Sequence, residues 1–189
     1  MRTAGLAAWR AGHAGLAARA RLRYNGPGAM GNRYGLLRLQ NPVMDYDWGS
    51  RTAISDLLGS PSPSPAPQAE LWMGAHPRAP PLALTDDGPL PLPELIRRDP
   101  EGVLGAGVAA LFGGRLPFLF KVLAAERALS IQVHPDRGQA AEGFRRENAQ
   151  GLPPDDPRRC YRDPNPKPEI LCALTPFWAL AGFRPPGEA

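Results

Sequence analysis

Residues 116–135 read LPFLFKVLAAERALSIQVHP and carry the strongest strand pattern in the chain. Two short apolar runs, residues 118–124 and 129–133, are rich in Leu, Val, Ile and Phe and are separated by a charged break. Short apolar runs of this kind are typical of strands. The stretch therefore predicts two neighbouring strands at the centre of a mostly β fold, with short helices to one side.

The second run carries two polar side chains, Gln132 and His134, which are two residues apart. On a strand such residues point to the same face. Imidazole nitrogens and amide or carboxylate oxygens bind zinc, and Glu169, which follows a rigid Pro-Lys-Pro segment, offers a third ligand. In the alternative interpretation, His134 ends the strand before Pro135 and Gln132 makes an ordinary core hydrogen bond. Spacing alone favours this alternative.

Length and composition favour one soluble globular domain. The chain has 189 residues, enough for one domain with its own core. No apolar run approaches the ~20 residues of a membrane span. The 24 prolines favour a loop-rich, strand-based fold over a helical bundle.

Charge is unevenly distributed along the chain. The net charge is +4, but residues 1–44 hold seven arginines and no acidic residue, so subtracting these seven leaves −3 for the remainder. A folded part with this balance lacks the basic surface that nucleic-acid binding requires. We therefore expect no nucleic-acid partner.

Residues 1–34 form an Arg- and Ala-rich leader without acidic residues. Charged residues interrupt the apolar core that a secretory signal needs. Three interpretations remain: a disordered leader, an upstream start placed before the natural Met30, or an organelle transit peptide. Cys160 and Cys172 show no metal-binding spacing and are expected as free thiols in a reducing compartment. We expect a cytoplasmic protein, with organelle targeting as the alternative.

The remaining pattern alternates strands, short helices and loops. Strands are predicted at residues 34–43, 69–77, 169–174 and 177–183. Helices are predicted after the Trp48-Gly49 turn, in two segments of residues 92–114 divided at Asp99-Pro100, and after an N-cap at Asp136. The Ser/Pro-rich residues 60–68 are expected to be an exposed loop.

Four stretches resemble, in the same order, successive signatures of the type I phosphomannose isomerases. They are NPVMDYDWGS, AELWMGAHPRA, GRLPFLFKVLAAERALSIQVHPD and KPEILCALTPFWALAGFRP. The resemblance covers residues 37–186. It implies a cupin-type jelly roll, of which residues 35–189 would be the N-terminal, incomplete part. It also implies one zinc ion and a sugar phosphate substrate, with interconversion of mannose 6-phosphate and fructose 6-phosphate.

The resemblance also implies roles for individual residues. Gln132, His134 and Glu169 match the family's zinc ligands, whereas its fourth ligand, a later histidine, has no counterpart up to Ala189. The reaction would remove a proton beside a carbonyl and pass through an enediol(ate), with zinc as the Lewis acid and a general base to shuttle the proton. Lys167, which shares the face of Glu169 on an extended backbone, resembles an active-site lysine that binds substrate and assists proton transfer.

Three further residues, Trp48, Glu70 and Ser130, match substrate-pocket positions of the family. Trp48 and Ser130 have packing or strand-end roles as alternatives, and Lys167 has a surface role. One departure is Pro166, where the family commonly has a histidine before Lys-Pro-Glu. Because family members are longer, a truncated inactive fragment and a non-enzymatic sugar-phosphate- or metal-binding cupin stand as alternatives to the isomerase. The oligomeric state is not predicted.

Overall fold

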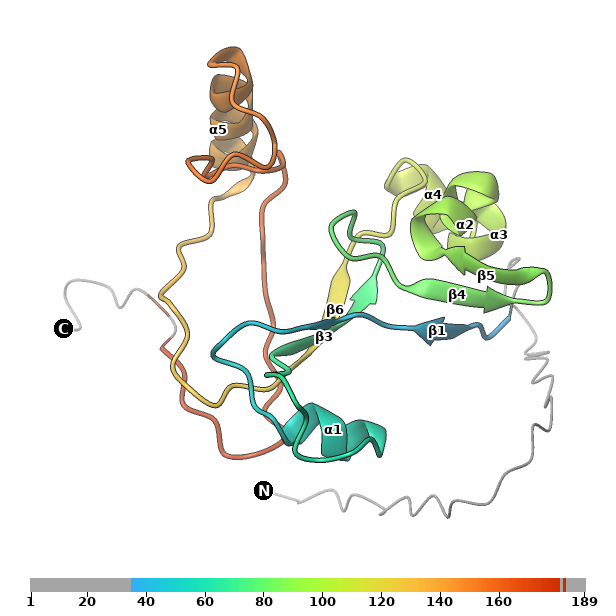
Figure 1. Ribbon diagram of the computed structural model, residues 1–189. Helices are drawn as coiled ribbons and strands as arrows, with labels where there is room; N and C mark the ends of the chain where they lie inside the picture. The colour runs from blue at the N-terminus through green and yellow to red at the C-terminus, as the bar shows by residue number, and fades with distance from the viewer. Residues whose placement is uncertain (1–34, 181, 183–189) are drawn as a thin grey trace, which may run out of the picture. The chain divides into compact units, whose positions relative to one another are not determined.

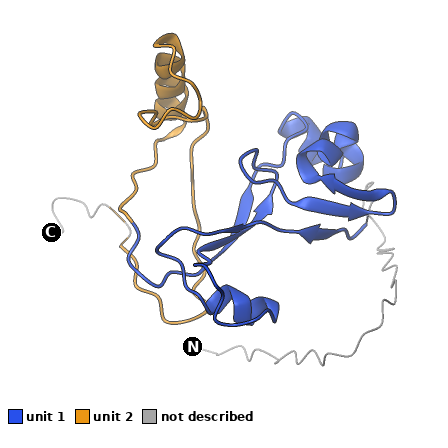
Figure 2. Cartoon of the chain, in the orientation of Figure 1, with its two compact units in different colours: residues 1–129 blue, residues 130–189 orange. Residues whose placement is uncertain are grey.

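The structure is a computed structural model that describes residues 35–180 and 182. The predicted leader, residues 1–34, lies outside the described residues. The chain divides into two compact units, residues 1–129 and 130–189 (Figure 2). Each unit is described by itself below. In the part of the chain that the structure describes, no helix has the length and apolar character needed to cross a membrane.

Unit 1 contains two antiparallel three-stranded sheets (Figure 1). The first has the order β1-β4-β5, with β1 (Arg38–Gln40), β4 (Leu82–Thr85) and β5 (Gly88–Pro91). The second has the order β2-β3-β6, with β2 (Val43–Met44), β3 (Glu70–Gly74) and β6 (Leu119–Leu123). The predicted strands at 69–77 and 118–124 are thus confirmed as β3 and β6. The predicted strand at 34–43 is split into β1 and β2 around Asn41-Pro42.

A hydrophobic core cluster of unit 1 lies on one face of the β2-β3-β6 sheet. Leu71 of β3 is opposite Val122 of β6, and residues opposite each other in an antiparallel pair point to the same face. Leu71 packs in a cluster with Ile54, which is fully buried, and Ala124. Ile54 belongs to α1 (Ala53–Leu58), the predicted helix after Trp48-Gly49. Since the side chains of β3 alternate, Glu70 and Trp72 point to the opposite face.

Three short helices follow the β4-β5 hairpin. They are α2 (Leu92–Arg98), α3 (Pro100–Leu104) and α4 (Ala106–Leu111). The predicted break at Asp99-Pro100 is confirmed, and the Asp99 carboxylate accepts the Gly102 N–H at 3.0 Å to cap α3. A further break at Gly105, with φ of 82°, makes three helices instead of two. The hairpin itself was not predicted.

Residues 60–68 contain neither a helix nor a named strand. Ser64 is buried, and its backbone N–H donates to the carbonyl oxygen of Arg51 at 2.7 Å. The Arg51 guanidinium in turn donates to the carbonyl oxygen of Pro65 at 2.7 Å. These bonds hold the segment beside the start of α1.

Unit 2 is built around α5 (Arg137–Ala149), whose predicted N-cap is confirmed. The Asp136 carboxylate accepts the Gln139 N–H at 2.8 Å, and the Gln139 side chain accepts the Asp136 N–H at 3.0 Å. This reciprocal pair is a capping box. It fixes the point at which the chain leaves the segment of His134 and enters the helix.

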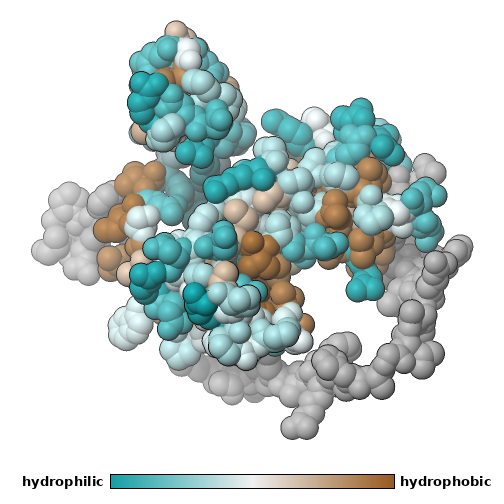
Figure 3. All heavy atoms as spheres, viewed as in Figure 1, coloured by the Kyte–Doolittle hydropathy of each residue, from teal (hydrophilic) through white to brown (hydrophobic). Residues whose placement is uncertain are grey.

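The predicted strands at 129–133, 169–174 and 177–183 are wrong for the described residues, because unit 2 has no strand there. A strand needs a neighbour that satisfies its backbone N–H and C=O groups, and no described segment supplies that ladder. Several apolar side chains of these segments are exposed; they are Ile131, Val133, Ile170, Leu174, Trp178 and Leu180. Apolar residues at the surface are visible as brown areas in Figure 3. An apolar run alone does not specify which segment would pair with it.

Candidate functional site

His134 and Glu169 are in direct contact in unit 2. The Nε2 atom of His134 lies 3.3 Å from Oε2 of Glu169, with 30% and 66% of the two side chains exposed. His134 comes just before the capped start of α5, and Glu169 follows Pro168 after the loop beyond that helix. The fold therefore brings together two of the three predicted metal ligands, although they are far apart in the sequence.

The separation of these two atoms fits a shared zinc ion. Zinc binds imidazole nitrogen and carboxylate oxygen at about 2.0–2.1 Å, so two ligand atoms at a tetrahedral zinc lie about 3.3 Å apart. The observed 3.3 Å equals that value. Both atoms are partly accessible, and a neutral imidazole with a carboxylate is a donor pair that zinc accepts.

The third donor has to come from another residue type. Within the described ranges, no group of three or more His, Cys, Asp and Glu side chains could hold a metal ion. Gln132, two residues before His134, is exposed and offers an amide oxygen. The donor set of Gln132, His134 and Glu169 is chemically suitable for zinc.

Lys167 lies in a loop organised by Asp163. Its Nζ is 3.7 Å from Oδ2 of Asp163, and 46% of the lysine side chain is exposed. The other carboxylate oxygen of Asp163 accepts the backbone N–H of Asn165 at 2.9 Å. The ammonium is therefore near a carboxylate and remains accessible to a ligand. Ser130, the first residue of unit 2, is exposed.

In unit 1, Glu70 belongs to a polar cluster on the face of the β2-β3-β6 sheet that lies opposite the core. The Trp72 indole N–H donates to Oε2 of Glu70 at 2.6 Å, and both residues are buried. Lys121, which lies opposite Trp72 in the β3-β6 register, places its Nζ 3.4 Å from the carboxylate. We call Glu70, Trp72 and Lys121 the Trp72 cluster.

Lys121 and Trp72 were not predicted as functional residues from the sequence. Lys121 is one of only two lysines in the chain, and it lies between apolar residues on a predicted strand. A single charge in an apolar strand was the sequence feature that could have marked Lys121 as a functional candidate. The contact between Lys121 and Trp72 could not be predicted from local sequence, because it depends on the register of β3 and β6, which are distant in sequence.

Trp48 lies in a turn that is tightly bound to the second sheet. Its carbonyl oxygen accepts the Glu126 N–H at 2.9 Å, and its ring stacks on Tyr46 with centroids 5.7 Å apart. At the next residue, Gly49, an added Cβ would lie 2.6 Å from the backbone nitrogen of Ala69. Only glycine permits this approach, so the position of Trp48 is set by a close backbone contact.

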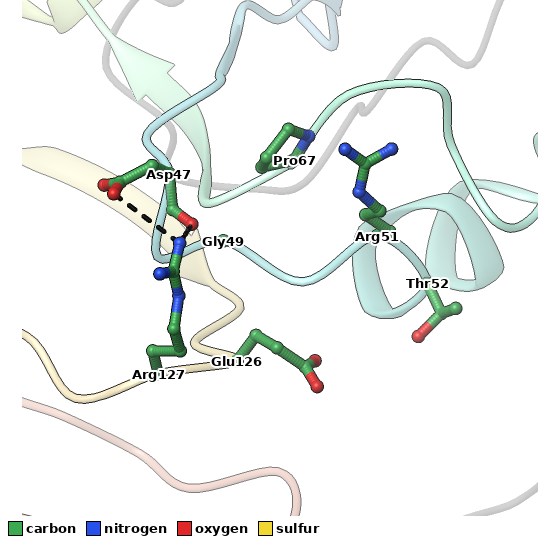
Figure 4. Close-up of a pocket in the computed structure, with 7 residues that line it drawn as sticks. All are labelled: Asp47, Gly49, Arg51, Thr52, Pro67, Glu126 and Arg127. Carbon is green, nitrogen blue, oxygen red and sulfur yellow. Dashed lines mark hydrogen bonds and ion pairs between the residues drawn. The ribbon is translucent and has the colours of Figure 1, made fainter.

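A cavity of about 410 Å³ lies beside this turn (Figure 4). Its lining residues include two arginines and two acidic residues; they are Asp47, Gly49, Arg51, Thr52, Pro67, Glu126 and Arg127. The Arg127 guanidinium donates to the Asp47 carbonyl and lies 3.5 Å from its carboxylate. None of the predicted site residues lines this cavity, so it is separate from the candidate ligand sets.

Comparison with known proteins agrees with the motifs. The family model described as the catalytic domain of type I phosphomannose isomerase matches residues 36–186. The chain is 49% identical over 148 residues to mannose-6-phosphate isomerase of Escherichia coli K12, covering 78% of this chain and 38% of that protein. It is 39% identical over 160 residues to the mannose-6-phosphate isomerase of Candida albicans, covering 79% of this chain and 34% of that protein.

Solved structures show the same similarity. A zinc-bound mannose 6-phosphate isomerase superposes with a TM-score of 0.64 and 46% identity, covering 69% of this chain and 33% of that one. The Salmonella typhimurium enzyme bound to fructose 6-phosphate and zinc gives the same values. The chain thus spans about a third of the length of these relatives. The predicted fold class, a mostly β structure with short helices that forms part of a cupin-type jelly roll, is confirmed.

Proposed function

This chain belongs to the type I phosphomannose isomerase family, and from that premise we propose that it serves the interconversion of mannose 6-phosphate and fructose 6-phosphate. The observation that supports this most directly is the 3.3 Å contact between His134 and Glu169. We further propose that residues 35–189 are the N-terminal part of the family's cupin domain, that residues 1–34 are a leader, and that the protein is cytoplasmic.

Gln132, His134 and Glu169 are the proposed zinc ligands. When bound, zinc would act as a Lewis acid and stabilise negative charge developing on the sugar oxygens. His134 would bind through Nε2, the atom that faces Glu169. Glu169 would supply the negative charge of the set and Gln132 a neutral oxygen.

Variants of the Salmonella enzyme whose structures are solved add support. They carry substitutions of a lysine, a histidine and a glutamate, with the lysine 13 residues before the histidine and the glutamate 35 residues after it. Lys121, His134 and Glu169 have the same residue types at the same spacing. We therefore add Lys121 to the proposed functional residues.

The isomerisation itself is a proton transfer between neighbouring carbons. A base removes the proton from C2 of mannose 6-phosphate, the carbonyl oxygen at C1 gains a proton and the O2 hydroxyl loses one, and a proton is delivered to C1. The intermediate is an enediol(ate), and no atom other than hydrogen changes place. Lys167 is the proposed catalytic residue, because its accessible ammonium can donate to a developing oxyanion and exchange a proton.

Substrate binding is proposed for Trp48, Glu70, Ser130 and Lys167. Lys167 offers three N–H donors for the phosphate or a hydroxyl group, and the Glu70 carboxylate accepts from a sugar hydroxyl or orients a neighbouring cation. Trp48 presents an aromatic surface on which the C–H face of a sugar can pack. Ser130 supplies an exposed hydroxyl group.

Isomerase turnover on purified zinc-loaded protein, with mannose 6-phosphate as substrate, tests the proposal. We expect turnover that falls at least 100-fold in Glu169→Gln, a loss of about 3 kcal/mol of transition-state stabilisation. Glu142→Gln is the matched control, since Glu142 is an exposed residue of the same unit and pairs with Arg145 on the surface of α5. Equal turnover in the two variants, or none in the wild type, would contradict the proposal.

A further inference from the structure

The Trp72 cluster has features that packing alone does not require. Trp72 and Glu70 are 5% and 7% exposed, so the Glu70 carboxylate is a buried charge that needs partners. The indole N–H supplies one at 2.6 Å, on Oε2. Hydrogen bonds to a charged acceptor are shorter and stronger than neutral ones, which matches this short distance.

Lys121 contacts both of these residues. Its Nζ lies 3.4 Å from Oε1 of Glu70 and 5.1 Å from the centroid of the Trp72 ring. The ammonium therefore has a carboxylate on one side and the electron-rich face of an indole on another. A lysine side chain is flexible. The contacts with Glu70 and Trp72, both on β3, restrict where the charge of Lys121 can lie.

The end of the Lys121 side chain remains partly accessible, with 34% of the side chain exposed. An ammonium has three donors, and the long contact with Glu70 leaves donors for an anionic or hydroxyl group of a ligand. The ring of Trp72 is itself supported by His76, whose ring meets it edge-on at 5.0 Å. The indole thus contacts His76, Glu70 and Lys121 at the same time.

We propose that Trp72 is a positioning residue, which orients Glu70 through its indole N–H and Lys121 through its ring face, so that the Lys121 ammonium is presented to the sugar phosphate. This inference rests on the proposed function and assigns Trp72 a role beyond packing. A core tryptophan also needs an acceptor for its buried N–H, but losing that bond would not change ligand binding, whereas in this role it would weaken it. Trp72→Phe keeps most of the ring and removes the N–H, so it separates the two roles.

The first test is spectroscopic and uses the full chain labelled with ¹⁵N. The four tryptophans of the sequence give separate indole N–H signals, and Trp72→Phe identifies the signal of Trp72. We expect this signal to lie downfield of that of Trp178, which is 97% exposed, and to move toward it in Glu70→Gln, where the acceptor loses its charge. Addition of fructose 6-phosphate should shift the Trp72 signal in the wild type and not in Lys121→Met.

The second test is the affinity for fructose 6-phosphate, measured by titration calorimetry. We expect Trp72→Phe to bind about tenfold more weakly, which corresponds to about 1.4 kcal/mol, and Trp72→Leu, which also loses the aromatic face, to bind more weakly still. Trp178→Phe is the matched control and should bind like the wild type. Melting curves by circular dichroism show whether each variant is folded.

The inference is overturned if the Trp72 signal does not respond to Glu70→Gln, if fructose 6-phosphate leaves it unchanged, or if Trp72→Phe binds like the wild type. If the Trp72 variants do not fold, the Trp72 signal is assigned by elimination from Phe variants of the other three tryptophans, and the Glu70→Gln and Lys121→Met spectra then decide the question. Failure of the proposed function is a different result. A wild-type chain that binds fructose 6-phosphate with these signal changes but does not isomerise it would remove the isomerase assignment and leave the role of Trp72 intact.

Discussion

Replacing Arg159 with alanine should loosen the loop of unit 2 that follows α5. The guanidinium is fully buried and donates to the carbonyl oxygens of Leu152 at 2.7 Å and Tyr161 at 2.8 Å. It also lies 3.6 Å from the carboxylate of Glu147, and only 8% of the Glu147 side chain is exposed. Removing one member of a buried charged pair typically costs about 3–5 kcal/mol.

The effect can be measured by hydrogen exchange at two reporter amides. The backbone N–H groups of Cys160 and Tyr161 donate to the Glu147 carboxylate at 3.1 and 2.9 Å. A loss of about 3 kcal/mol in local stability would speed their exchange by about 100-fold or more. Because the same loop leads to Glu169, the affinity for zinc should fall in parallel.

Arg145→Ala is the matched control. Arg145 lies on α5 and pairs with Glu142 at 2.7 Å, but 72% of its side chain is exposed. Exposed pairs of this kind contribute little to stability, so the two reporter amides should exchange at nearly the wild-type rate. Equal exchange in the two arginine variants would refute the view that the buried Arg159 organises this loop.

Three further predictions concern local structure. Asp136→Ala removes the cap of α5 and should lower the free energy of unfolding by about 1 kcal/mol. The melting curve followed by the helical signal in circular dichroism should shift to lower temperature, and an unchanged curve would contradict the prediction. Gly49→Ala places a Cβ 2.6 Å from the Ala69 nitrogen and should destabilise unit 1 by about 1–3 kcal/mol in urea unfolding; wild-type stability would show that the turn can move. Hydrogen bonds from Arg97, and to a smaller extent from Arg98, lower the pKa of Glu94 from its ordinary 4.5 to about 2. Their contribution to stability is therefore present above pH 4.5 and is lost as the pH falls from 4.5 to about 2. Arg97→Gln should therefore flatten that part of an acid-unfolding curve.

Local pattern was sufficient for part of the fold. Alternating or apolar runs identified β3 and β6, Asp136 identified the start of α5, and Pro100 identified the end of α2. The β4-β5 hairpin was missed because the prolines in β5 are poor strand residues except at a sheet edge. β5 is such an edge strand, which was not visible from its own sequence.

The failures in unit 2 have a different cause. Residues 129–133 and 169–174 have apolar strand-like patterns, but a strand forms only with a partner that completes its hydrogen bonds. That partner is a property of the whole sheet. A local pattern therefore predicted strands, and it could not predict that these residues are unpaired and that Ile131 and Ile170 are exposed in this structure.

The candidate site could be predicted only as residue types. The motifs identified His134 and Glu169, while their 3.3 Å contact depends on how α5 and its following loop return the chain. Glu70 was identified by resemblance, but its contacts with Trp72 and Lys121 depend on the β3-β6 register. Contacts made across distant strands and loops are the part that sequence spacing does not contain.

The zinc content of the purified chain tests the central claim most directly. After equilibrium dialysis against zinc and removal of loosely bound metal, we expect about one zinc ion per chain for the single proposed site. His134→Ala and Glu169→Ala should lose it, whereas His76→Ala, which changes a histidine outside the proposed ligand set, should retain it. Zinc retained in both ligand variants, or no bound zinc in the wild type, would contradict a metal centre formed by Gln132, His134 and Glu169.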